Sequence, residues 1–366
     1  MTIIAQLQDE MKSENLDLLY YDDPLVVSYL TGFESDPHER VLAVLLFQDA
    51  LWMICPAMEY PSVKTIKEAQ LVLPYKDENS PWAILKEALD HSPKQVTRIG
   101  ISEDTLSVAR YHSLRSVFKE AEFENSTSLI QNKRVIKQPH EITIMKEAGD
   151  LADKALKVGM DYLKNGISEE EVVAKIEYEM KKIGVADMSF STMVLFGDHA
   201  ASPHGTPGKR QLQPGELVLF DLGVVHKGYT SDVTRTVAYG EVSEKAKEIY
   251  HIVLEAQEMA QKAVKAGMTT GELDAIARTV IKEAGYGEYF THRLGHGLGK
   301  SVHEFPDVAP NVTVELKNGM CFSIEPGIYI ENSVGVRIED CVYVTDNGAI
   351  PFTHTPKELI VLPVKE

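Results

Sequence analysis

The sequence lacks the features of membrane, secreted and nucleic-acid-binding proteins. Its longest apolar run, near Val41–Phe47, is far shorter than the ~20 residues that span a bilayer. The N-terminus has no basic start followed by an apolar stretch. Three cysteines in 366 residues do not make a disulfide framework, and a formal charge of -18 would repel nucleic-acid phosphates. We therefore expect a reduced, cytoplasmic protein with no membrane or nucleic-acid partner.

Length and composition indicate two globular domains. A chain of 366 residues exceeds the usual size of a single core, and 44% hydrophobic with 25% charged residues is ordinary for a globular protein. Residues 1 to about 125 alternate apolar runs, VLAVLLF and ALWMIC, with an amphipathic helix in SPWAILKEALD, which predicts an α/β domain. The chain then turns polar over residues 124–139. We therefore place the domains at residues 1–130 and 131–366.

The C-terminal part contains an internal repeat. Residues 163–184 align with residues 264–285 at a constant offset of 101, and six of the 22 positions are identical. Each copy opens with a capping box, Ser168–Glu171 and Thr269–Glu272, in which hydroxyl and carboxylate satisfy backbone N–H groups. Two amphipathic helices can resemble each other by chance. A duplicated domain with pseudo-twofold symmetry is the interpretation we favour.

Potential metal ligands are spread along the same part of the chain. They are four carboxylates and one imidazole, at Asp221, Asp232, His296, Glu325 and Glu339. So many oxygen donors do not suit one zinc ion, which usually takes four ligands rich in nitrogen and sulfur. They suit two hard divalent cations that share carboxylates and a water. Because the first two ligands follow the first repeat and the others follow the second, we expect a binuclear hydrolase site where the two halves meet.

The first two ligands lie in a predicted β-hairpin, ELVLFDLGVVHKGYTSDVTRTVAYG, that turns near His226–Gly228. Folding there brings Asp221 and Asp232 to nearly facing positions on adjacent strands, ~5 Å apart at Cβ. Facing like charges destabilise a hairpin unless a cation lies between them. Taken alone, each aspartate can instead cap a turn or pair with an arginine such as Arg235.

Glycine-rich loops carry the candidate histidines. HRLGHGLGKSVHEFP holds His292, His296 and His303 among glycines that prevent a stable helix. We assign His296 to metal and leave His292 and His303 for the substrate and the oxyanion. SPHGTPG carries His204 between proline and glycine, where a histidine taken alone is more often structural than catalytic.

Glu325 and Glu339 lie in apolar strands. FSIEPGIYI places Glu325 before a Pro-Gly turn, and GVRIEDCVYVT places Glu339 in an alternating strand. An unpaired buried carboxylate costs several kcal/mol, so each needs a partner, which a metal supplies. Arg337 points to the same strand face as Glu339. It either orients a carboxylate of the site or binds the carboxylate of a substrate, and an ordinary ion pair is an equal alternative.

Together these segments resemble the pita-bread metallopeptidases, the family of methionine aminopeptidase, aminopeptidase P and prolidase. The resemblance covers about residues 140–360 and rests on PHGTPG, DLG…YTSDVTRT, GHGLG…VHE, SIEPGIY and RIED. It implies an α+β fold, with a duplicated pseudo-twofold pita-bread catalytic domain after a smaller creatinase-like α/β domain. All five ligand positions are filled, which argues against the metal-free creatinase branch. Chain length and the wording GDHAASPHG are similar to the short bacterial prolidases, the Xaa-Pro dipeptidases.

The resemblance also implies how the ligands divide. Asp232, His296 and Glu325 would hold one ion, Asp221 would hold the other, and Glu339 would bridge them. The two ions would be manganese or cobalt. A hydroxide bridging them would attack the carbonyl before proline while Glu325 takes up the proton.

The remaining roles concern the substrate, a small Xaa-Pro peptide. By resemblance, His303 and His204 would steady the oxyanion and the scissile peptide. His292 and Arg337 would face the proline end. We therefore expect a metallopeptidase of the prolidase type.

One position departs from the family pattern. Some dipeptidases of this family carry an arginine four residues after the position of His303, where it can clamp the free carboxylate of proline. Here that position is Asp307. The departure favours an aminopeptidase P that takes longer Xaa-Pro peptides, unless a cation such as Arg293 substitutes. A third alternative, a non-peptidase or binding protein on the same scaffold, predicts lost metal ligands.

The N-terminal domain offers another cation. LTGFESDPHERVL places Asp36, His38, Glu39 and Arg40 in a turn before a buried strand. Family members form homodimers in which the N-terminal domain of one subunit reaches the site of the other. By that resemblance the loop would close over the partner's substrate, with Arg40 or Arg293 on its carboxylate. The alternative is a solvated surface loop.

Overall fold

A computed structural model describes residues 1–366, which divide into two compact units, Met1–Arg134 and Val135–Glu366. The polar stretch predicted as the junction is not all loop. A helix, α6 (Thr127–Arg134), occupies part of it and buries Leu129 and Ile130. Polar composition concealed these two apolar positions, which pack in the core of the first unit. None of the helices combines the length and apolar character needed to cross a membrane.

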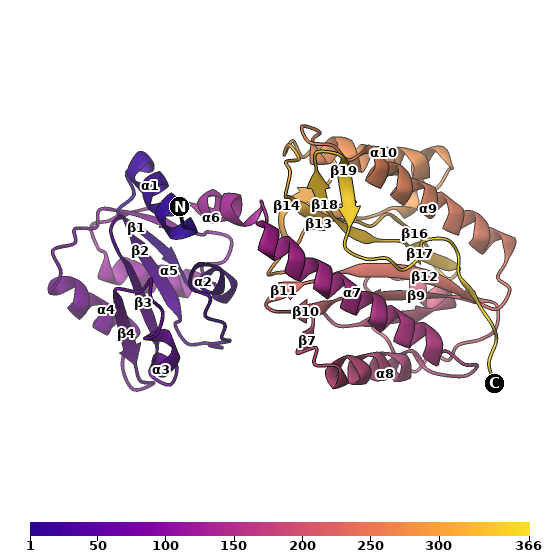
Figure 1. Cartoon of the computed structure of the whole chain (residues 1–366), viewed down its shortest axis with the longest axis horizontal. Coiled ribbons are helices and arrows are strands. Elements are labelled where there is room, and N and C mark those ends of the chain that lie inside the picture. The colour runs from indigo at the N-terminus through magenta and orange to yellow at the C-terminus, as the bar shows by residue number, and fades with distance from the viewer. The chain divides into compact units, whose positions relative to one another are not determined.

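The first unit is a mixed six-stranded sheet between helices (Figure 1), with strand order β4-β3-β2-β1-β5-β6. Its elements are α1 (Ile3–Glu14), β1 (Leu18–Tyr21), α2 (Pro24–Thr31), β2 (Ala43–Phe47), β3 (Leu51–Pro56), α3 (Tyr60–Val63), β4 (Leu71–Tyr75), α4 (Pro81–Asp90), β5 (Arg98–Ile101), α5 (Val108–Val117) and β6 (Glu122–Asn125). Strands β2 and β3 are buried along their whole length, because apolar clusters cover both faces of the sheet. The predicted strands and the helix capped by Ser80 are confirmed.

The second unit contains the repeat. Its elements are α7 (Pro139–Tyr162), α8 (Glu169–Lys182), β7 (Asp187–Met188), β8 (Met193–Phe196), η1 (Gly197–Ala201), β9 (Glu216–Leu222), β10 (Val224–His226), β11 (Tyr229–Thr230), β12 (Val233–Tyr239), α9 (Glu244–Ala263), α10 (Thr270–Glu283), η2 (Gly287–Tyr289), β13 (Gly295–Gly297), β14 (Glu304–Val308), β15 (Cys321–Ile324), β16 (Gly327–Ile330), β17 (Val334–Arg337), β18 (Asp340–Thr345), β19 (Gly348–Pro351) and β20 (Val361–Leu362). Figure 1 shows α9 and α10 along one side of the strands and α8 along the other.

Two helix pairs cover two sheets in the same way. Helices α7 and α8 share one apolar core with β8, β9 and β12, while α9 and α10 share another with β14, β15 and β18. Both predicted capping boxes form: Ser168 N donates to Glu171 at 2.8 Å and Thr269 N to Glu272 at 2.7 Å. The α+β fold with a duplicated C-terminal unit is confirmed.

Candidate metal centre

The first two predicted ligands lie on one long hairpin. It turns at Lys227 and Gly228, whose φ angles of 48° and 76° are the pair that a two-residue type I′ turn requires. The turn is where the sequence predicts it, but the register differs. Asp221 faces Thr234, so Asp232 lies two residues away from the facing position. Both aspartates nevertheless line the same cavity.

The other three ligands come from the second half of the repeat. His296 is the central residue of β13, which pairs with β15. Strand β15 pairs with β18 so that Ile324 faces Asp340. This register places the next residues outward, Glu325 and Glu339, at the same end of the two strands. The ligands therefore meet because two strand ends and a hairpin converge.

The ligand atoms are close enough to share cations. Atoms of Asp232, His296 and Glu339 lie within 4.8 Å of one another. Nε2 of His296 is 3.2 Å from Glu325 Oε1 and 3.8 Å from Asp232 Oδ2. Its Nδ1 lies 3.2 Å from the carbonyl oxygen of Gly297, which can only accept, so Nδ1 donates. That bond leaves the lone pair of Nε2 facing the carboxylates, as metal ligation requires.

The carboxylates lack hydrogen-bond donors for some of their buried oxygens. One oxygen each of Asp221, Asp232 and Glu339 is buried without a hydrogen-bond partner. Burial, together with repulsion from neighbouring carboxylates, raises the pKa of Asp232 and Glu339 well above the usual range. Buried anions of this kind require cations or protons. The residues therefore fit divalent cations with an affinity for oxygen ligands.

A buried arginine contacts the predicted metal ligands directly and through a threonine. Arg337 is 3% exposed and forms an ion pair with Asp221. Its Nε donates to Thr234 Oγ1 at 3.2 Å, and Thr234 in turn donates to Glu339 Oε2 at 2.7 Å. Between the two roles left open for Arg337, the geometry favours the orientation of a carboxylate of the site. Thr234 is not among the residues predicted from the sequence, although strand alternation from Asp232 places it on the same face.

A second missed residue, Tyr329, links the arginine to a histidine. Its hydroxyl accepts from Arg337 Nη1 at 2.9 Å and lies 2.9 Å from His292 Nε2. Because His292 Nδ1 is 2.7 Å from the carbonyl of Arg293 and must donate, Nε2 accepts from the hydroxyl. Burial lowers the pKa of His292. Both its nitrogens are engaged, so it offers the cavity its ring and not a free nitrogen. A phenol in an apolar strand needs a partner, and that signal was present in GIYI.

These side chains surround a cavity of about 380 Å³. Its lining consists of Phe190, Met193, Pro203, His204, Asp221, Asp232, His292, Arg293, His296, Val302, His303, Glu325, Arg337 and Glu339. The ring centroid of His303 is 4.0 Å from that of His296. Burial and the nearby His296 lower the pKa of His303 to about 4, so it is neutral at pH 7. The structure thus brings His204, His292 and His303 together with the five ligands.

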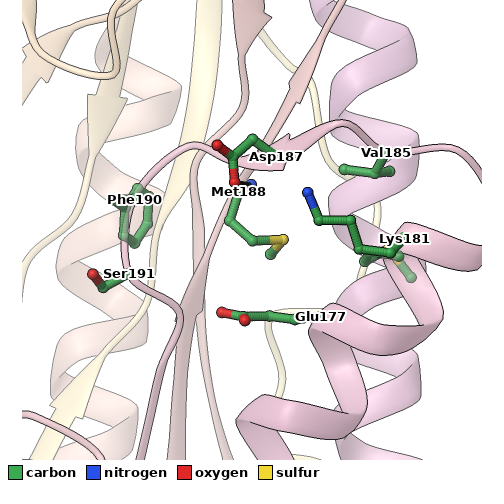
Figure 2. A pocket seen from close by; sticks show the side chains of 8 residues that line it. Glu177, Lys181, Val185, Asp187, Met188, Phe190 and Ser191 are labelled. Atoms are coloured by element: carbon green, nitrogen blue, oxygen red, sulfur yellow. Dashed lines mark hydrogen bonds between the residues drawn. The ribbon is translucent and has the colours of Figure 1, made fainter. Parts of the chain in front are cut away.

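One segment separates this cavity from another. A cavity of about 250 Å³ lies between α8 and the segment Asp187–Ser191. Figure 2 shows the side chains that line it. Phe190 lines both cavities. Ser189 ties the segment to the ligand hairpin, because its N–H donates to Gly223 O at 2.9 Å and its hydroxyl to Ser231 O at 2.8 Å. The wall of the metal cavity is therefore fixed next to both aspartate ligands.

The residue that departs from the family pattern has a partner. Asp307 forms an ion pair with Arg293, which lines the cavity. The two side chains are 55% and 34% exposed, so solvent screens the pair. The cation expected to replace the missing arginine is thus already partly neutralised by the aspartate that stands in its place.

The candidate loop of the N-terminal unit is held by its own unit. Arg40 donates from Nε and Nη2 to the carboxylate of Asp77 at 2.8 Å and 2.9 Å. Asp36 accepts from the backbone N–H of His38 at 2.9 Å, and the carbonyl of Glu39 accepts from an arginine side chain at 2.7 Å. The side chains of His38 and Asp36 are exposed. Arg40 is therefore not a free cation within this unit.

Comparisons with known proteins match both units. Residues 143–346 match metallopeptidase family M24, and residues 3–136 match the creatinase/prolidase N-terminal domain. A Xaa-Pro dipeptidase of Lactobacillus delbrueckii subsp. lactis is 45% identical over 366 residues, covering 99% of this chain and 100% of that protein. A solved Xaa-Pro dipeptidase from Bacillus anthracis is 35% identical with a TM-score of 0.91, covering 98% of this chain and 99% of that one. The prolidase from Pyrococcus horikoshii OT3 is 36% identical with a TM-score of 0.90 and the same coverage.

Proposed function

Because the chain belongs to metallopeptidase family M24, we propose that it is a prolidase that hydrolyses the peptide bond preceding proline in Xaa-Pro dipeptides. The main support for a metal-dependent hydrolase is a set of carboxylates that line one cavity and have buried oxygens without a hydrogen-bond partner. The choice of Xaa-Pro substrates is supported by full-length similarity to Xaa-Pro dipeptidases. We place the enzyme in the cytoplasm, consistent with its three buried, unpaired cysteines.

The proposed ligand roles are those that the resemblance to the family implies. Asp232, His296 and Glu325 would hold one ion, Asp221 the other, and Glu339 both. Two divalent ions, with manganese preferred over cobalt, would supply a water of lowered pKa as the nucleophile. Glu325, whose Oε1 lies 3.2 Å from His296 Nε2, would accept the proton of the attacking water.

The histidines would act on the peptide. His303 is neutral at pH 7 and keeps an N–H that can donate to a developing oxyanion. His204, which lines the same cavity, would hold the scissile peptide in place. His292 would pack its ring against proline, since both its nitrogens are already engaged. Arg337 would contribute at the proline end through Asp221 and Tyr329.

The free carboxylate of a dipeptide needs a cation, and we assign it to Arg293. Asp307 competes with the substrate for this guanidinium. Asp307→Asn should therefore lower KM for Leu-Pro severalfold and leave kcat nearly unchanged, because the effect lies in ground-state binding. Arg293→Ala should raise KM for the dipeptide. A wild-type KM in both variants would refute the assignment.

A homodimer would bring a second set of candidates to the site. The loop with Asp36, His38, Glu39 and Arg40 would close over the substrate of the partner subunit, where Arg40 would exchange its bond with Asp77 for the substrate carboxylate. Arg40→Ala is the test. An unchanged KM in Arg40→Ala, or a monomer with full activity in sedimentation and kinetic assays, would exclude the loop from the site.

The alternative is an aminopeptidase P that releases the first residue of longer Xaa-Pro peptides. The pairing of Arg293 with Asp307 favours it, because a peptide longer than two residues brings no carboxylate to this position. The deciding assay compares Leu-Pro with Leu-Pro-Pro, using metal-stripped protein resupplied with manganese or cobalt. Cleavage of the dipeptide supports the prolidase, and a clear preference for the tripeptide supports the aminopeptidase. Failure to cleave either peptide would overturn both.

A further inference from the structure

A buried carboxylate outside the metal centre, Glu169, holds the loop that carries His204. Glu169 is the first residue of α8, and its side chain is 0% exposed. Its oxygens accept hydrogen bonds from Phe196 N at 2.8 Å, Gly208 N at 2.9 Å and His199 Nδ1 at 2.8 Å. Phe196 and Gly208 are the two ends of the loop. One side chain therefore joins both loop ends to a helix.

The loop between these ends reaches the metal cavity. Pro203 and His204 both line it. Arg210 holds the loop from the other side, since Nε donates to Phe196 O at 2.8 Å and Nη2 to Asp198 Oδ1 at 2.6 Å. The position of His204 thus depends on two charged side chains that do not themselves line the cavity.

The internal repeat supplies a comparison within the same chain. At the offset of 101 residues, Thr270 takes the place of Glu169. Both helices begin with the same capping box, and in both the second residue donates its N–H to a carbonyl of a later segment, at 3.1 Å and 2.9 Å. Thr270 is buried, and its hydroxyl has no hydrogen-bond partner. A helix start of this kind therefore needs no carboxylate at its first position.

We propose that Glu169 is a positioning residue for His204, an inference that rests on the proposed role of His204 at the scissile peptide. A buried carboxylate is costly unless several donors satisfy it, and its bonds to N–H groups are stronger than neutral ones. Glu169 finds these donors only when the loop of residues 197–208 is in place. The burial of Glu169 and the position of the loop are therefore coupled. The carboxylate occurs in the half of the repeat whose loop carries His204, whereas the other half brings His303 to the cavity without it.

The first test is Glu169→Thr, which gives α8 the residue found at the equivalent position of α10. The variant keeps the capping box, so the helix start is retained. Because displacing a catalytic group by ~1 Å can cost about 100-fold in rate, we expect kcat for Leu-Pro to fall about 10- to 100-fold with little change in KM. Ser168→Ala is the matched control. It removes the cap of the same helix and should lower the melting temperature while kcat stays near wild type.

A double-mutant cycle separates positioning from general damage. If Glu169 acts through His204, adding Glu169→Thr to His204→Ala should lower kcat little further. Glu169→Gln provides the same test in a side chain of equal size, because its amide cannot accept from all three donors. A full additional loss in the His204→Ala background would overturn the proposal, as would wild-type kcat in both Glu169 variants. If instead His204→Ala itself has wild-type kcat, the proposed role of His204 fails first, and the positioning role fails with it.

Discussion

Replacing Glu339 with glutamine should affect the metal-free and metal-loaded proteins in opposite directions. Glu339 is 1% exposed, and burial together with the charges of Glu325 and Asp221 raises its pKa. At pH 7, this carboxylate destabilises the folded state by at most about 3.4 kcal/mol. If the charged form were less favourable than that, the carboxylate would be protonated instead. The bound is the interval from the ordinary pKa of 4.5 to pH 7, at ~1.36 kcal/mol per pH unit.

Glutamine should remove most of this cost. Glutamine keeps the volume of the side chain. It can still accept the hydrogen bond from Thr234 Oγ1, which lies 2.7 Å from Glu339 Oε2 in the wild type. Allowing about 1 kcal/mol for a weaker hydrogen bond, we expect the metal-free variant to unfold with a free energy about 2 kcal/mol above wild type. The folded pKa is raised, so the penalty in wild type is absent below pH 4.5 and grows as the pH rises. The difference should therefore vanish in acid and increase towards neutral pH.

Urea denaturation of chelator-treated protein, followed by circular dichroism, measures the first effect. Adding manganese measures the second, because a ligand that binds only the folded state raises its stability. Manganese should raise the unfolding free energy of wild type strongly. It should raise that of Glu339→Gln much less, because this variant has lost a ligand proposed to be shared by both ions. Glu331→Gln, an exposed carboxylate between β16 and β17, is the control for a change of charge alone. A metal-free variant less stable than wild type, or a full manganese effect in it, would refute the reasoning.

Three further predictions concern the framework of the site. Arg235 is 1% exposed and donates to Asp340 Oδ1 at 2.6 Å and to buried backbone carbonyls. Arg235→Met should therefore cost about 1–3 kcal/mol in urea denaturation by leaving these acceptors without a donor, although Lys357 still pairs with Asp340 at 3.2 Å. Tyr329→Phe removes the hydroxyl between a cavity histidine and a buried arginine. It should raise KM for Leu-Pro about fivefold, equivalent to ~1 kcal/mol, in steady-state assays. Ser168→Ala and Thr269→Ala should each cost about 1 kcal/mol of unfolding free energy, and a large inequality would argue that the two capping boxes are not equivalent.

The sequence was sufficient to propose the ligands and to find the repeat, because both depend on local patterns. An acidic residue in an apolar strand is conspicuous at Glu325 and Glu339, and a capping box occupies four consecutive residues. The hairpin register was not accessible in the same way. Moving the centre of the turn by one residue shifts the facing pairs by two, so the predicted pairing of Asp221 with Asp232 became a pairing with Thr234. Only the positive φ of both Lys227 and Gly228 selects the turn.

Ion pairs and hydrogen bonds between residues far apart in the chain were also not predicted from the sequence. Nothing near Asp307 indicates that Arg293 neutralises it, and nothing near Arg40 indicates Asp77. Such ion pairs depend on loops that approach only in the folded chain. Glu169 shows the same limitation, since its donors lie 27 to 39 residues away along the chain. For charged residues assigned from sequence to a substrate, the partners in the folded chain were therefore the part that could not be predicted.

The duplication explains why the charges gather where the two halves meet. Each half has an apolar core that contains none of the ligands, and Leu217 and Ala238 of the first half also pack into the core of the second. Across the join, Glu339 N donates to Thr234 O at 3.1 Å and Thr236 Oγ1 to Arg337 O at 2.9 Å, bonds that bring two negatively charged strand ends together. Without cations this contact is opposed by repulsion and desolvation, and with them it is favoured. Metal binding and the association of the two halves are therefore thermodynamically linked. A change that separates the halves must also lower the affinity for the metal ions.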